Sequence, residues 1–104
     1  MRHPQAERIG AVIPAVIRQL EHQRRALRTV QEEWGRLVGK RLAAHTRPVS
    51  LRHGRLVVHV ERPGDGFALS YARVELVERL RASTQGKVEE MVIRPGEIKN
   101  ALPR

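Results

Sequence analysis

Arginine and lysine are the residues of this 104-residue chain whose chemistry points most directly to a partner. The chain has 20 Lys and Arg against 11 Asp and Glu, a formal net charge of +9. Such a surplus favours a polyanion as partner, and nucleic acid first. The basic residues that we expect to contact phosphates are Arg24, Arg25, Arg28, Arg36, Lys40, Arg41, Arg47, Arg52 and Arg55. The alternative is a solvated outer helix face, but its acidic partners, Glu32 and Glu33, are few and both sit at one end.

Other site chemistry has little support in the sequence. The spacing of the histidines at 45, 53 and 59 matches no common metal-ligand motif, and the chain has no Cys. Glu89 and Glu90 alternate across a predicted strand instead of converging as a catalytic carboxylate pair would. A GxxxxGK[ST] phosphate loop is absent from the sequence. We therefore predict a protein that is not an enzyme and holds no metal or cofactor.

Two amphipathic helices are predicted in the first half of the chain. The first covers residues 6–23, with Pro14 either starting or kinking it, and the second covers about 25–45, so that Arg36 and Lys40 share a face. Gly35 and Gly39 lie inside the second helix, where each costs about 1 kcal/mol relative to Ala. A close backbone approach by another element or a partner is the predicted reason for them.

Apolar residues of these helices are either core or partner-binding. The second helix carries a stripe that includes Leu27, Val30 and Trp34, and Trp34 is predicted mainly as core, with a partner-binding role as the alternative. The first helix has a wide apolar face that could be a docking surface. The predicted partner-binding residues are Trp34, Ile13 and Ile17.

The second half of the chain switches to strands and one more helix. Residues 49–53 and 55–61 read as antiparallel strands joined at His53 and Gly54, and residues 88–94 as a third strand. A helix from 65 or 67 to about 83 is predicted between them, with one apolar face comprising Phe67, Tyr71, Val74, Val77 and Leu80. The fold class is α+β: a three-stranded sheet with helices packed on one face, in the order α-α-β-β-α-β. The other sheet face is predicted to be partly open, carrying Arg52, His53, Arg55 and His59.

The run from Trp34 to Pro48, WGRLVGKRLAAHTRP, followed by LRHGRLVVHV from Leu51 to Val60, resembles the DciA family of bacterial replicative-helicase loading proteins. The residues at the family's motif positions are Trp34, Val38, Gly39, Leu42, Ala43, His45, Thr46, Pro48, Gly54, Leu56, Val58 and Val60. The resemblance covers about residues 8 to 95. It departs where relatives often carry an aromatic, commonly Trp, just after the second strand; Phe67 can fill that slot here. It departs also in the long terminal extension of many relatives, which this chain does not show.

The resemblance implies a K-homology-like domain over residues 1–95, without the GxxG loop of K-homology domains. Residues 96–104 have no hydrophobic pattern, so the sequence predicts a short flexible tail there. The resemblance also implies a DNA-binding adaptor that assists loading of the DnaB-type helicase hexamer onto single-stranded or forked DNA, without ATPase activity of its own. No apolar segment of the sequence predicts a signal peptide or a membrane span, so the expected location is cytoplasmic, without a membrane partner. The sequence does not determine the oligomeric state. The alternatives are a general nucleic-acid-binding domain, acting on RNA or the ribosome with no helicase partner, and a structural interaction module whose charge is incidental.

Overall fold

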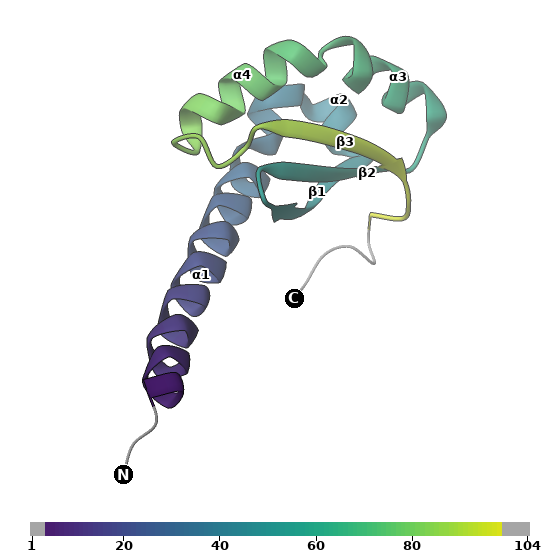
Figure 1. Ribbon diagram of the computed structural model, residues 1–104. Helices are drawn as coiled ribbons and strands as arrows, with labels where there is room; N and C mark the ends of the chain where they lie inside the picture. Colours follow the sequence, from purple (N-terminus) through teal and green to yellow (C-terminus); the bar gives the residue numbers. More distant parts are fainter. Residues whose placement is uncertain (1–3, 99–104) are drawn as a thin grey trace.

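The computed structural model describes residues 4–98, with side chains from residue 14 onward (Figure 1). A three-stranded sheet with helices packed against it confirms the predicted α+β fold class. Among the described helices, none is long and apolar enough to cross a membrane. The elements are α1 (Pro4–Val38), α2 (Lys40–Ala43), β1 (Thr46–Arg52), β2 (Arg55–Val60), α3 (Pro63–Tyr71), α4 (Arg73–Ser83) and β3 (Glu90–Pro95).

A single long helix, α1, stands where the sequence predicts the first helix and most of the second. Pro14 lies inside it without ending it. Residues 22–28, which surround the predicted boundary between the two helices, include three Arg, one Leu and one Ala, which are good helix formers, and they continue the helix. The two-helix boundary near residue 24 was therefore wrong. The N-terminal half of α1 projects away from the rest of the fold (Figure 1).

Gly39 ends α1, and its conformation explains why a glycine is present. Its φ of 90° and ψ of 157° belong to a region that is open essentially only to glycine. The four-residue α2 begins immediately after it, so Arg36 and Lys40 lie on different helices and do not share a face. At Gly35, a Cβ would meet nothing within 4 Å, so the predicted close approach of another element is wrong there.

Trp34 joins α1 to the start of the sheet. Its side chain is only 3% exposed, and its Nε1–H donates a hydrogen bond of 2.9 Å to Oγ1 of Thr46. The Thr46 hydroxyl in turn donates to the backbone carbonyl of Leu42, at 2.7 Å. This chain of bonds fixes the end of α2 and the first residue of β1 against α1. The structure thus places Trp34 in the core, and not on an exposed partner-binding surface.

The sheet has the order β1-β2-β3, with β1 and β2 antiparallel and β2 and β3 parallel. His53 and Gly54, at φ 51° and 80°, form the tight turn between β1 and β2 that the sequence predicts. The register shifts between Pro48 and Ser50. This irregularity leaves Val49 unpaired and lets both Pro48 and Leu51 face the core, although they are three residues apart.

The predicted third helix is divided at Ala72 into α3 and α4, and its predicted apolar face is wrong in part. Leu80 and Val77 are buried as predicted, but Phe67, Tyr71 and Val74 are 78%, 94% and 75% exposed. The break at Ala72, with φ −93° and ψ 6°, interrupts the 3.6-residue period, so the two apolar stripes do not line up. The buried residues of this segment are Asp65, Leu69, Leu76, Val77 and Leu80.

Candidate nucleic-acid interface

The sheet has one face covered by helices and one open face, and strand alternation decides which residues lie on each. The core face packs against Ala26, Val30 and Trp34 of α1 and against the apolar residues of α3 and α4. Its own residues include Leu51, Leu56, Val58 and Met91, all buried. From the strand register, the open face consists of Arg47, Ser50, Arg52, Arg55, Val57, His59, Glu90, Val92 and Arg94.

One cross-strand row of the open face contains two arginines and a histidine. His59 of β2 is paired with Arg47 of β1 and with Arg94 of β3. Burial lowers the pKa of the Arg47 guanidinium from its ordinary value. Nε of Arg47 and Nδ1 of His59 are both buried and find no hydrogen-bond partner among the described residues. Gly96 lies against the His59 ring, since a Cβ there would come within 2.7 Å of Nδ1. Buried polar atoms of this kind call for a ligand or water.

A second row lies toward the hairpin turn, and it is also basic. Arg55 is paired with Arg52 on one side and Glu90 on the other, and its Nε lies 3.6 Å from the Glu90 carboxylate. Arg52 makes no ion pair among the described residues. Between the two rows, a hollow of about 320 Å³ is lined by residues from all three strands, Ser50, Arg52, His53, Arg55, Val57 and Arg94. A phosphate group placed there would meet guanidinium groups from more than one strand.

The nine predicted basic residues do not form one stripe. Arg47, Arg52 and Arg55 lie on the open face. The sequence analysis had predicted this position for Arg52 and Arg55. The other six are all exposed, and they lie in the helical layer on the opposite side of the sheet: Arg24, Arg25, Arg28, Arg36, Lys40 and Arg41. The helical period divides them further, because Arg24 and Arg28 lie one turn apart while Arg25 and Arg36 follow a neighbouring face of α1.

Arg94 is the basic residue of the open face that the sequence analysis missed. It follows Ile93, which packs against the core, so alternation within the predicted strand could have assigned Arg94 to the other face. What the sequence could not provide was the neighbour of that strand. Only the parallel register of β3 against β2 brings Arg94 beside His59.

The predicted partner-binding residues are not brought together. Trp34 is buried, and Ile17 is 51% exposed on the projecting half of α1, next to Val16 and Leu20, which are also about half exposed. Ile13 belongs to α1, but its side chain lies outside the described residues. The exposed apolar residues of α3, Phe67 and Tyr71, form a second apolar surface that the sequence analysis had assigned to the core.

The histidines that were weighed as metal ligands are held apart by the fold. Nδ1 of His45 lies 3.2 Å from Oε1 of Glu61, at the far end of the sheet from the hairpin turn that contains His53. His59 lies on the open face between two arginines. Within residues 14–98, no group of three or more His, Asp or Glu side chains is placed to share a metal ion.

Comparison with known protein families assigns this chain to a family. A family model described as Dna[CI] antecedent, DciA, matches residues 8–93, which is most of the chain. The chain belongs to the DciA family. DciA proteins are associated with the DnaB-type replicative helicase and with its loading in DNA replication, so the general role of this protein lies in that process. A search of curated proteins finds no match.

In this DciA chain, the residues that carry the family motif are structural. Trp34 and Thr46 bond to each other, Gly39 separates the two N-terminal helices, and Gly54 completes the hairpin turn. The motif residues of β2 are buried on the core face: Leu56, Val58 and Val60. The motif therefore specifies the DciA fold, whereas the basic open face is built from the residues that alternate with it.

Proposed function

We propose that this protein is an adaptor that holds DNA on the open face of its sheet while it contacts the replicative helicase. The family match supports the helicase-associated role. The observation that carries the DNA-binding part is the set of cross-strand arginines on the open face, Arg47, Arg52, Arg55 and Arg94. The three paired strands hold the backbones of these arginines in place, so that binding a phosphate requires ordering of the side chains only.

The unpartnered donors on this face favour an anionic ligand. Nε of Arg47 has no acceptor among the described residues although it is buried, and leaving such a donor unpaired costs free energy. An arginine keeps its proton at neutral pH even when burial lowers its pKa, so it can only donate. A phosphate oxygen is an acceptor that satisfies both the charge and the hydrogen bond.

Binding should follow the nucleic-acid backbone more than the base sequence. The two exposed aromatic residues, Phe67 and Tyr71, belong to α3 and not to the open face, so base stacking has no platform among the arginines. The apolar residues between the rows, Val57 and Val92, are small. We therefore expect single-stranded or forked DNA to bind with little sequence preference.

The adaptor works through binding energy in this proposal. The sequence contains no GxxxxGK[ST] loop to hold ATP. A protein that binds DNA and the helicase at separate surfaces raises the local concentration of one beside the other. Helicase loading would then be accelerated without nucleotide hydrolysis by this chain.

The test is a light-scattering titration against the replicative helicase hexamer of the same organism, with and without single-stranded DNA, followed by a loading assay. We expect a complex and faster loading. The double variant Arg52→Glu/Arg55→Glu should still bind the helicase but should no longer accelerate loading. If the wild-type protein forms no complex with the helicase yet binds nucleic acid in a salt-sensitive way, the adaptor proposal fails and a general nucleic-acid-binding domain takes its place.

A further inference from the structure

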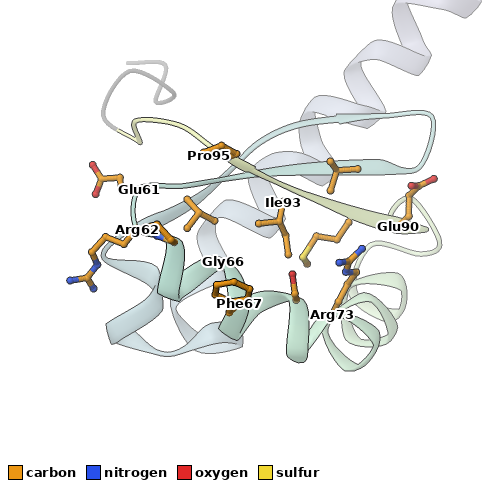
Figure 2. Close-up of a pocket in the computed structure, with 13 residues that line it drawn as sticks. Glu61, Arg62, Gly66, Phe67, Arg73, Glu90, Ile93 and Pro95 are labelled. Carbon is orange, nitrogen blue, oxygen red and sulfur yellow. The ribbon is translucent and has the colours of Figure 1, made fainter.

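A groove between α3 and the outer edge of β3 has a volume of about 600 Å³. Figure 2 shows Phe67 on the α3 wall, Ile93 on the β3 wall and Arg73 at the end near α4. Gly66 lies at the other end of the groove and faces the sheet, since a Cβ there would be in ordinary contact with Val60 and Ile93 at about 4 Å. Phe67 is 78% exposed, so a large aromatic side chain lies at the mouth of this groove and no other described residue covers it.

The charges around the groove argue against a nucleic acid as its occupant. Its lining includes two acids, Glu61 and Glu90, and two arginines, so it is balanced on a chain of net charge +9. Arg62 is engaged by Asp65, with Nε and Oδ2 3.2 Å apart. A polyanion finds far better complementarity on the open face, where Arg47, Arg52 and Arg94 lie.

The β3 wall adds a feature that selects an extended occupant. β3 is an end strand of the sheet, paired with β2 along one edge only. The other edge of β3 runs along the groove, since successive residues of β3 line the groove. The backbone N–H and C=O groups on that edge can pair with a strand from another molecule. Side chains of an added strand would alternate between the apolar groove and the basic open face.

We propose that this groove binds an extended segment of the replicative helicase as a fourth strand beside β3. The segment carries apolar residues at alternate positions, which enter the groove beside Phe67 and Met91, and polar or acidic residues between them, which face Arg94. This inference rests on the proposed function, because it names where the helicase docks. It also places helicase and DNA on adjoining surfaces that meet at β3.

The experiment measures helicase affinity for two exposed, charge-matched variants by titration with the hexamer. We expect Phe67→Asp to weaken helicase binding by about tenfold or more, as for an aromatic anchor at an interface. Val74→Asp, which places the same charge on an exposed apolar residue of α4 outside the groove lining, should stay within about twofold of wild type. Circular dichroism verifies that both variants are folded, and both should lose the same small amount of DNA affinity.

Hydrogen exchange of the wild-type protein distinguishes the binding mode. On adding helicase, the amides among residues 91–93 that face the outer edge of β3 should become more protected, as an added strand requires. The inference is overturned if Phe67→Asp binds helicase like wild type, if it impairs DNA binding instead, or if protection appears on α1 or α3 without β3. Absence of any wild-type complex with the helicase would instead count against the proposed function, so the two failures are distinguishable.

Discussion

Trp34 is the residue of the family motif that we expect to contribute most to the stability of the fold. It is buried against the sheet, and it bonds to Thr46. We predict that Trp34→Ala lowers the free energy of unfolding by roughly 3 to 5 kcal/mol. Trp34→Phe keeps most of the packing and should lose mainly the hydrogen bond, about 1 kcal/mol. Urea unfolding followed by circular dichroism measures both. A Trp34→Ala protein as stable as wild type would contradict the core assignment.

Thr84 is a buried hydroxyl that closes the end of α4. Its Oγ1 donates to the Leu80 carbonyl at 2.6 Å and accepts from the Val88 backbone N–H at 3.1 Å. Thr84→Val keeps the shape but leaves that N–H without its acceptor, so we predict a loss of about 1 to 3 kcal/mol in unfolding free energy. Ser83→Ala is the control, since its half-buried hydroxyl bonds the same carbonyl only at 3.4 Å. Equal losses of unfolding free energy for the two variants would show that the hydrogen bond from Val88 to the Thr84 hydroxyl does not contribute to stability.

At the residue scale, the sequence predicted side chains best where one element determines their surroundings. Trp34 belongs to a single helix stripe, and its core position was predicted correctly. Phe67 and Tyr71 also fitted a helix stripe, but they are exposed because the helix breaks at Ala72. No proline or glycine in the sequence indicates this break. Arg94 was missed because its place beside His59 depends on a neighbouring strand.

At the element scale, the two glycines of the second predicted helix have opposite roles. Gly39 stands in a backbone region that other residues enter only at a cost, so Gly39→Ala should destabilise the fold by about 1 to 3 kcal/mol. Gly35 lies inside α1 with open space around it, so Gly35→Ala should stabilise it by about 0.5 to 1 kcal/mol. Thermal unfolding of the two variants tests this. Shifts of the same sign would contradict the opposite roles of the two glycines.

Element existence was predicted well, and element boundaries less well. The His53–Gly54 turn has the local chemistry of a tight hairpin and was placed correctly. The division of the N-terminal half into two helices failed, because the basic segment at residues 22–28 was taken as a boundary; Pro14 was predicted only to start or kink the first helix. Neither overrides a 35-residue helix of otherwise favourable composition.

On the scale of the whole molecule, the charge distribution predicts how DNA affinity responds to salt. Three to four phosphate contacts on the open face give a log-log slope of roughly −2 to −3 for single-stranded DNA. Fluorescence anisotropy at several salt concentrations measures the slope. A slope near zero would mean that the net charge of +9 is incidental, which is the structural-module alternative.

The overall architecture was accessible from the sequence, and the assembled site only in part. Alternation in the second strand already predicted an open face with Arg55 and His59. The parallel pairing of β3 with β2, and therefore the closed row from Arg47 to Arg94, comes from contacts between segments 35 residues apart in the sequence. Local periodicity contains no information on such a pairing.

The most direct test of the account is the affinity for single-stranded DNA of two charge-matched double reversals. Arg52→Glu/Arg55→Glu alters the open face, and Arg25→Glu/Arg36→Glu makes the same change in net charge on the outer surface of α1. The account predicts that the open-face variant loses about tenfold or more in affinity and has a shallower salt slope, while the α1 variant loses much less. Equal losses, or a larger loss for the α1 variant, would contradict the assignment of the open face as the DNA-binding surface.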